Sequence, residues 1–160
     1  MANNVSQEAD ISKELFSSID IDAPAETVWE ILIDFAAFPI WNPFIVEAEG
    51  RVQLGERVSL RMQPVVGSAI TLHPTVAELI EGRRLRWLGR LGLRRLFDAD
   101  HLFIVEPSAV AESRFIQRER FTGALVPFVR RSLDRGTLPA FQAMNAAIKD
   151  RAEKAIAASV

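Results

Sequence analysis

The chain has no cysteine and only two histidines, His73 and His101, among its 160 residues. Without cysteine it can form neither a disulfide nor a thiolate nucleophile. Two histidines argue against a histidine-rich metal site, so we expect no metal and no cofactor. No apolar run approaches the length of a membrane span, and the N-terminus lacks the basic–apolar–small pattern of a signal peptide. We therefore expect a cytoplasmic protein without an integral membrane segment.

The chain also lacks a large excess of charge of either sign, because its formal net charge is only -2. This balance gives no general attraction to nucleic acid or to an anionic membrane. Hydrophobic residues make up 49% of the chain and charged residues 25%, which is typical of a globular protein. With no repeat and no linker in 160 residues, we expect one domain over 13–157 after a loose polar tail at 1–12.

The last fifth of the chain, about 123–157, predicts a long amphipathic helix. After Pro139 alone it would span roughly 27 Å and would need a wide apolar surface to lie on. Gly136 and Pro139 interrupt the helical pattern, so a kink or break is expected just before Pro139. The apolar stripe consists of Phe141, Met144, Asn145, Ile148, Ala152, Ala155 and Ile156.

Before this helix, the pattern predicts a strand over 14–21 and a helix that begins at Pro24 and stops before Pro39. The segment 38–44 carries two prolines and predicts a tight, partly helical turn held by Trp41 and Phe44. Period-two patterns then predict six antiparallel strands, so the fold class is α+β. These strands are 45–49, 57–62, 69–80, 83–91, 98–106 and 112–121.

The last predicted hairpin carries polar side chains on the face that should meet the long helix. A turn centred near Ala109 would place His101 opposite Gln117, with Glu119 on the diagonal and within reach of a hydrogen bond to His101. Either these groups form a satisfied structural cluster, or they line a hollow and meet a ligand. The residues expected on this face are His101, Phe103, Val105, Phe115, Gln117, Glu119 and Phe121.

The strand 83–91 points Trp87 inward and its arginines outward. A nucleic-acid site would combine such basic residues with exposed aromatic side chains, but the aromatic side chains here point inward. We therefore expect a solvated face and no nucleic acid. His73, beside Pro74 in a strand that looks interrupted, has no assignable face.

Most catalytic signatures are missing, including a phosphate-binding loop, a nucleophile elbow and an HExxH motif. The remaining constellation is His101 with Glu119, joined by Trp41 and Asn42 if these lie at a pocket mouth. A His–Glu pair can transfer protons, or it can anchor a hydroxyl or carbonyl of a ligand.

Two motifs, IDAPAETVWE at 21–30 and FPIWNPF at 38–44, resemble the START-like (SRPBCC) superfamily. The chain is most similar to its bacterial polyketide cyclase/dehydrase and lipid-transport branch, over about 13–157. Further agreement comes from LRW at 85–87, LFDADHLF at 96–103, QRERFTG at 117–123 and FQAMN at 141–145.

The resemblance implies a helix-grip fold: a strongly curved seven-stranded antiparallel sheet around the C-terminal helix, with two short helices after the first strand and a hydrophobic cavity between sheet and helix. It also implies that the helix start, where Pro139 departs from the pattern, borders the cavity mouth. Movement at the Gly136–Pro139 break would then open a gate.

Our leading hypothesis is a non-catalytic binder or carrier of a small hydrophobic molecule, such as a lipid or polyketide. One alternative is a polyketide cyclase/dehydratase-like enzyme that uses His101 and Glu119 for proton transfer. Another is a protein-interaction module built on the arginine-rich strand. The expected ligand-binding residues are Trp41, Trp87, His101, Phe103, Phe115, Gln117, Glu119, Phe121, Phe141 and Met144.

Overall fold

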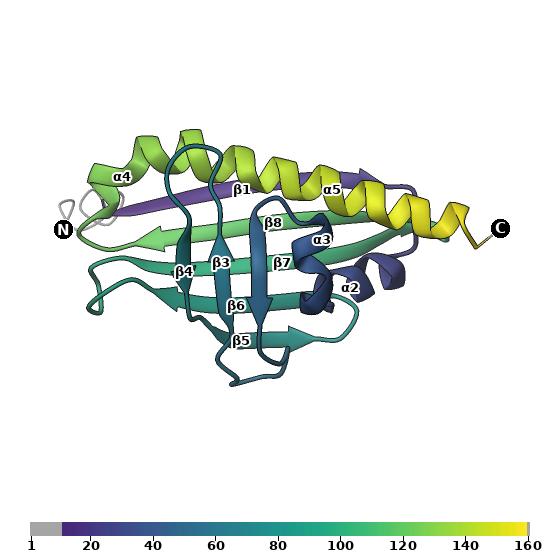
Figure 1. Cartoon of the computed structure of the whole chain (residues 1–160), viewed down its shortest axis with the longest axis horizontal. Coiled ribbons are helices and arrows are strands. Elements are labelled where there is room, and N and C mark those ends of the chain that lie inside the picture. The colour runs from purple at the N-terminus through teal and green to yellow at the C-terminus, as the bar shows by residue number, and fades with distance from the viewer. Residues whose placement is uncertain (1–10, 160) are drawn as a thin grey trace, which may run out of the picture.

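The computed structural model describes residues 11–159 and shows two antiparallel sheets with a long C-terminal helix (Figure 1). The chain starts with β1 (Ser12–Ile21), α2 (Ala25–Ile33), a short 3-10 turn (Phe35–Ala37) and α3 (Phe38–Trp41). It continues with β2 (Ile45–Glu49), β3 (Ser59–Met62), β4 (Ile70–Leu72), β5 (Thr75–Ile80), β6 (Arg84–Arg90), β7 (Asp98–Ala109) and β8 (Glu112–Thr122). It ends with α4 (Val126–Ser132), a π-helical segment (Leu133–Thr137) and α5 (Leu138–Ala157).

The strands form a five-stranded sheet in the order β1-β8-β7-β6-β5 and a three-stranded sheet in the order β2-β3-β4. In Figure 1 the small sheet crosses in front of the large one, and α5 runs along both. The core lies between these three layers, where apolar side chains of both sheets meet those of α5. The predicted α+β helix-grip architecture is confirmed.

The strand count is eight instead of the predicted seven, because the predicted strand 69–80 is divided at His73 and Pro74. Proline has no N–H for the strand ladder, so regular pairing stops there. The chain crosses from the small sheet to the large one at this point. The Val58 N–H still donates a hydrogen bond to the Pro74 carbonyl at 2.9 Å. The division therefore forms the sharp bend between the two sheets.

The β7–β8 hairpin turns at Val110 and Ala111, not at Ala109, so its register differs from the prediction by two residues. The pairing is disturbed between Pro107 and Ala109, where a bulge accommodates the proline. An even shift keeps every side chain on its predicted face. It also makes His101 and Glu119 direct cross-strand neighbours instead of diagonal ones.

The predicted helix and proline-bracketed turn after β1 are both present. Asn42 holds the turn, because its Oδ1 accepts hydrogen bonds from the backbone N–H groups of Phe44 and Ile45. Phe44 is buried in the core, while Trp41 is only half-buried at the edge of it. The turn thereby packs against β2 and α5.

Of the predicted kink or break before Pro139, a break is absent, but the regular α-helix is interrupted there. Residues 126–157 are helical throughout, and a π-helical segment replaces the expected break. Its wider turn is closed by the Leu138 N–H, which donates to the Leu133 carbonyl five residues earlier. The wider turn gives the Pro139 ring room that a regular α-helix would not.

Within residues 11–159, no helix combines the length and apolar character needed to cross a membrane. The boundaries of the predicted domain, 13–157, stay a prediction, and most of the predicted tail lies outside the described residues.

Candidate functional site

A cluster of three polar side chains lies on the inner face of β7 and β8, apart from Ser113 near the start of β8. His101, Gln117 and Glu119 are all buried, as alternation along the two strands predicted. Because a buried polar group costs free energy unless it is paired, their hydrogen bonds decide whether this cluster is only structural.

Gln117 is the centre of the cluster. Its Nε2 donates to the Phe141 carbonyl at 3.2 Å and to Asn145 Oδ1 at 2.7 Å. These two acceptors fix the amide orientation and leave Oε1 facing His101 Nε2 at 3.2 Å. Since Oε1 can only accept, the proton of the neutral imidazole lies on Nε2, and Nδ1 is a bare acceptor.

The network continues across α5 to β1. Asn145 Nδ2 donates to Ser17 Oγ at 2.9 Å, and both side chains are buried. The sequence placed Asn145 on the apolar helix stripe but did not assign it to the polar cluster, and it missed Ser17. Ser17 alternates with Leu15 and Ile21 on the buried face of β1, and this pattern could have identified it.

Both titratable groups of the cluster are uncharged near neutral pH. Burial lowers the pKa of His101 from 6.5 to about 3, against the opposing effect of its hydrogen bond to Gln117. Burial also raises the pKa of Glu119 from 4.5 to about 8, and the negative charge of Asp100 adds to this rise. The carboxylic acid can therefore donate a hydrogen bond, while His101 Nδ1 can accept one.

Polar atoms in this buried region lack hydrogen bonds. His101 Nδ1 lies 3.7 Å from Glu119 Oε2, which is beyond hydrogen-bond distance. The indole Nε1 of the neighbouring Trp87 is buried and also has no partner among the described residues. A buried acceptor on His101 and a buried N–H donor on Trp87 are thus both unsatisfied, and the carboxylic acid of Glu119 lies beside the acceptor.

Aromatic rings surround the cluster and close it. The rings of His101 and Phe103 stack with centroids 4.0 Å apart, and Phe141 lies on the imidazole at 4.9 Å. Trp87 meets Phe103 edge-on at 4.9 Å, and Phe44 meets Phe141 at 5.3 Å. The aromatic side chains therefore pack closely around His101 in the region where a cavity was expected.

Most of the predicted ligand-binding residues come together in this interior. Phe115 stacks on Phe103 at 6.1 Å, and Met144 is fully buried. Phe121 is buried at the end of β8, where it contacts Phe97.

Trp41 does not join the group. It lines a separate depression of about 680 Å³ beside α2 and α5. Three aromatic rings, those of Phe38, Phe35 and Trp87, separate it from His101. Asn42, which was expected beside it, supports the turn instead.

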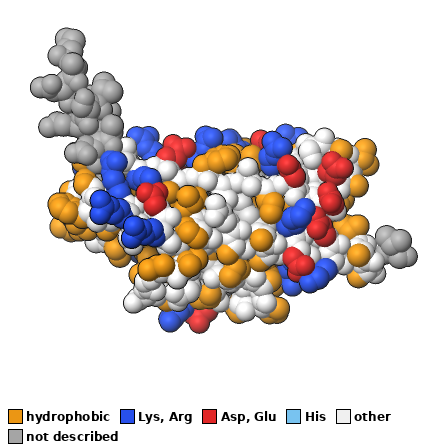
Figure 2. Space-filling model, turned by 90° about the horizontal axis from the view of Figure 1, so that it is seen from above, with side chains coloured by type: hydrophobic (Ala, Val, Ile, Leu, Met, Phe, Trp, Pro, Cys, Tyr) orange, Lys and Arg blue, Asp and Glu red, His pale blue; other side chains and the backbone are white. Residues whose placement is uncertain are grey.

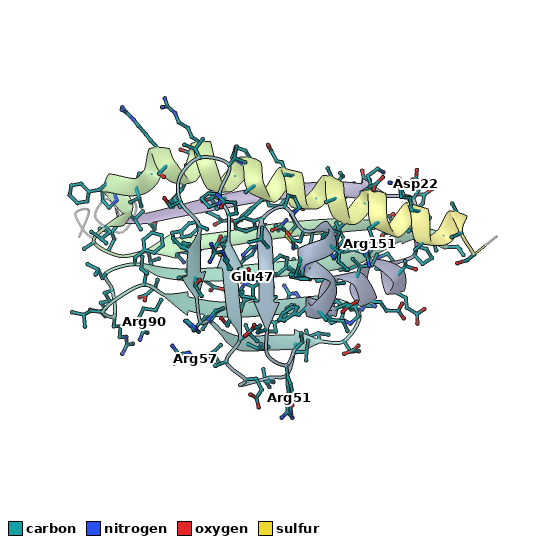
Figure 3. The ribbon with its side chains drawn as sticks, viewed as in Figure 1. Asp22, Glu47, Arg51, Arg57, Arg90 and Arg151 are labelled. Carbon is teal, nitrogen blue, oxygen red and sulfur yellow. The ribbon has the colours of Figure 1, made fainter. Side chains whose placement is uncertain are left out.

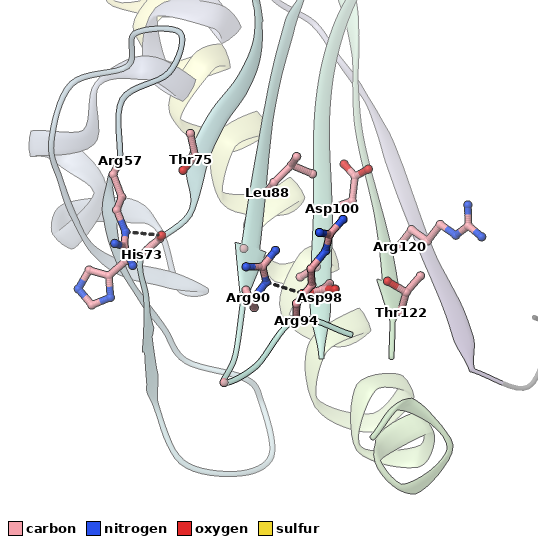
Figure 4. A pocket seen from close by; sticks show the side chains of 13 residues that line it. Arg57, His73, Thr75, Leu88, Arg90, Arg94, Asp98, Asp100, Arg120 and Thr122 are labelled. Atoms are coloured by element: carbon pink, nitrogen blue, oxygen red, sulfur yellow. Dashed lines mark hydrogen bonds and ion pairs between the residues drawn. The ribbon is translucent and has the colours of Figure 1, made fainter. Parts of the chain in front are cut away.

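A larger depression, of about 790 Å³, lies outside the interior, at the end of the large sheet where β6 and β7 join (Figure 4). Its polar groups bind one another: Arg90 Nε donates to Asp98 at 2.9 Å, and Arg57 Nε donates to the His73 carbonyl at 3.1 Å. Arg120 points away from the other labelled side chains. These side chains do not converge on one position, and none of His101, Gln117 and Glu119 lines the depression.

The arginines of β6 point outward, as predicted, and are paired. Arg84 bonds to Glu78, Arg86 to Asp100, and Arg90 to Asp98. Figure 3 shows Arg90 at the end of β6, beside the β6–β7 loop. Because neighbouring strands supply the carboxylates, this face carries balanced charge, as a solvated sheet surface does.

The sequence model of one protein family, described as "Polyketide cyclase / dehydrase and lipid transport", matches residues 14–153. No curated protein sequence matches the chain.

Solved structures share the fold at low sequence identity. The Zhui aromatase/cyclase from Streptomyces sp. R1128 is 18% identical, with a TM-score of 0.76 over 91% of this chain and 96% of that one. Norcoclaurine synthase from Thalictrum flavum is 14% identical, with a TM-score of 0.71 over 90% and 96%. A START superfamily protein from Mycobacterium smegmatis is 17% identical, with a TM-score of 0.68 over 88% and 97%.

Proposed function

Because the chain belongs to the polyketide cyclase / dehydrase and lipid transport family, we propose that it binds a small hydrophobic molecule between the large sheet and α5. The ligand carries a hydroxyl or carbonyl group, which meets His101 and Glu119. Its apolar body lies among Trp87, Phe103 and Phe141. Phe115, Gln117, Phe121 and Met144 complete the predicted lining.

One observation carries this proposal: the buried atoms His101 Nδ1 and Trp87 Nε1 lack hydrogen bonds, and the Glu119 carboxyl lies 3.7 Å from His101 Nδ1. A purely structural cluster would gain by pairing them, since each unsatisfied buried group costs about 1–3 kcal/mol. Gln117, Asn145 and Ser17 are satisfied, so the deficit is confined to one side of the network. A polar group of a ligand on that side would remove it.

The geometry suits a single hydroxyl oxygen. An oxygen placed about 2.8 Å from both His101 Nδ1 and Glu119 Oε2 would donate to the imidazole and accept from the carboxylic acid. A carbonyl would accept from Glu119 alone. Ligands with at least one such oxygen are therefore favoured over pure hydrocarbons.

Entry requires the closed interior to open, and the structure has a discrete contact where this can happen. The β3–β4 loop, 63–69, lies on the π-helical segment, with the Val65 N–H donating to the Gly136 carbonyl at 3.0 Å. Gly136 has no side chain, and a Cβ there would lie only 2.8 Å from the Val66 carbonyl oxygen. We propose that separation of this loop from the helix admits the ligand.

A second function, cyclization or dehydration of a polyketide-like carbonyl compound, is favoured by the protonation states of the pair. Glu119 is a protonated acid near neutral pH and His101 Nδ1 is an unprotonated base. With a substrate between them, Glu119 would protonate a carbonyl oxygen while His101 removes a proton from the adjacent carbon. The binder is the leading proposal, because it needs only hydrogen bonds from the pair, whereas the reaction also needs two proton transfers.

The test is a binding titration with two probes, emodin as a hydroxylated anthraquinone and palmitic acid as a lipid. We expect saturable one-to-one binding of at least one probe to the wild type. Glu119→Leu and His101→Leu should each weaken it about tenfold or more, since each removes one hydrogen bond to the ligand.

The control is Val110→Ser, which changes a fully exposed residue in the β7–β8 turn and should leave binding unchanged. Circular dichroism must show that all variants are folded. Failure of both probes to bind, or equal binding by the folded leucine variants, would contradict the proposal. Turnover of a polyketide substrate that both leucine variants abolish would favour the enzyme instead.

A further inference from the structure

One end of the molecule presents large hydrophobic side chains to solvent. Phe128 on α4 is 84% exposed, and Leu93 in the β6–β7 loop is 79% exposed. Leu91 and Leu125, from the same loop and the start of the same helix, are also exposed. Scattered exposed hydrophobics are ordinary, but a group at one end indicates an interaction surface.

The two elements are fixed to each other by the backbone. The Ala124 N–H donates to the Arg95 carbonyl and the Leu125 N–H to the Leu96 carbonyl, both at 3.0 Å. Gly123 makes this close approach possible, because a Cβ at that position would collide with the loop backbone. Phe128 and Leu93 therefore belong to one preformed surface.

Unpaired arginines border this apolar end. Within the described part of the chain, Arg94, Arg131 and Arg135 are exposed and take part in no ion pair. Asp134, the acidic residue of this helical stretch, is paired with Lys13 at 2.6 Å. Figure 2 shows basic side chains beside hydrophobic ones at the end that carries α4. The arginines of β6, by contrast, are neutralised.

Helical spacing places the two kinds of side chain together. Phe128, Arg131 and Arg135 follow at intervals of three and four residues and share the exposed side of the helix. A phenyl ring inserted among acyl chains would leave the long guanidinium side chains at the level of lipid phosphates.

We propose that this end, formed by α4 and the β6–β7 loop, docks on an anionic lipid membrane. Phe128 and Leu93 insert, and Arg94, Arg131 and Arg135 contact the headgroups. An anionic bilayer complements both features, whereas nucleic acid would match only the charge. The net charge of -2 does not oppose this, because the positive charge is local.

Docking would also orient the proposed entrance. Gly136, which carries the β3–β4 loop contact, directly follows Arg135 in the chain. The loop itself exposes Val65 and Val66. A molecule leaving the interior at this contact would emerge beside the bilayer. The docking proposal itself does not depend on the interior site, because it can be measured without any ligand.

The test is co-sedimentation of the full chain with vesicles of phosphatidylcholine alone or with 30% phosphatidylglycerol. We expect binding to the anionic vesicles, little binding to the neutral ones, and loss of binding at high salt. Phe128→Ser with Leu93→Ser should weaken binding about tenfold or more, because inserted apolar area is lost. Arg131→Glu with Arg135→Glu should weaken it about 25-fold or more, at about fivefold for each basic side chain.

Matched controls are Val110→Ser, an exposed hydrophobic residue in a different hairpin, and Arg51→Glu with Arg61→Glu, two exposed arginines in the β2–β3 connection and on β3. All should bind like the wild type. The proposal is overturned if anionic vesicles do not bind the wild type, or if the controls weaken binding as much as the variants. It is also overturned if the Phe128 and Leu93 substitutions change only the oligomeric mass, which would identify a protein contact.

Discussion

His101 and Glu119 face each other as a direct cross-strand pair on β7 and β8, with Nδ1 3.7 Å from Oε2. A histidine and a glutamate can form an ion pair, but these two do not. Burial keeps the imidazole unprotonated and the carboxyl protonated near neutral pH. The result is one acceptor and one donor held side by side, and neither is engaged. This relationship is the basis of the proposed ligand contact.

The first prediction is a pH dependence of stability caused by this pair. The pKa of Glu119 rises on folding from 4.5 to about 8, so its contribution is complete below pH 4.5 and is lost as the pH rises toward 8. The pKa of His101 falls from 6.5 to about 3, so its contribution is complete above pH 6.5 and is lost as the pH falls toward 3. The two slopes oppose each other between pH 4.5 and 6.5 and nearly cancel there.

Urea unfolding of the wild type and of Glu119→Gln at several pH values measures this effect. Between pH 6.5 and 8, the free energy of unfolding of the wild type should fall relative to the variant by on the order of 1 kcal/mol per pH unit. Parallel curves for the two proteins over that range would show that Glu119 ionises normally in the folded state.

The second prediction concerns Gln117, which bonds to His101, Asn145 and the Phe141 carbonyl. Gln117→Leu leaves those partners buried without it and should lower the free energy of unfolding by about 2–4 kcal/mol. The matched control, Gln53→Leu, changes an exposed glutamine in the β2–β3 connection and should shift stability by no more than about 0.5 kcal/mol. Equal, small effects of both substitutions would indicate that the network contributes little.

The third prediction concerns the contact between the β3–β4 loop and the helix. A Cβ at Gly136 would lie 2.8 Å from the Val66 carbonyl oxygen, so Gly136→Ala must displace the loop. We expect a loss of about 1–3 kcal/mol and faster amide hydrogen exchange at 63–69. A matched control is Gly89→Ala, whose Cβ would make only ordinary contacts, the nearest at 3.7 Å.

Unchanged exchange at 63–69 in a folded Gly136→Ala protein would argue against this loop as the moving part. Faster amide hydrogen exchange together with faster binding of a probe would instead connect the contact between the loop and the helix to ligand entry.

The sequence predicted which faces of the strands are buried. Side chains alternate between the two faces of a strand, so a register error of two residues leaves each side chain on its predicted face. The hairpin shift of two residues therefore left His101, Gln117 and Glu119 on the inner face. The exact neighbours could not be predicted, since the turn position depends on how Pro107 is accommodated by a bulge. The sequence placed Glu119 on the diagonal from His101, and only the structure shows that the two residues are directly opposite each other.

The sequence also could not predict the long-range contacts or the packing of side chains in the interior. The bond from Asn145 to Ser17 joins residues 128 positions apart, and a helical stripe alone does not show which strand it will meet. Ring contacts inside the protein, such as His101 on Phe141, could not be predicted either, because they depend on side-chain rotamers and on the placement of the helix. The continuous helix at Pro139 depends on a π-helical turn that no local pattern indicated.

The central claim is that a ligand oxygen meets the bare Nδ1 of His101, and the direct measurement is 15N NMR of histidine-labelled protein during a titration with emodin. Only two imidazoles are present, so His73 serves as an internal control. We predict that free His101 remains the neutral Nε2–H tautomer between pH 4.5 and 8, and that emodin shifts its Nδ1 resonance upfield while His73 is unchanged. A His101 that titrates near pH 6.5, or an Nδ1 resonance that does not move while emodin binds, would contradict the account.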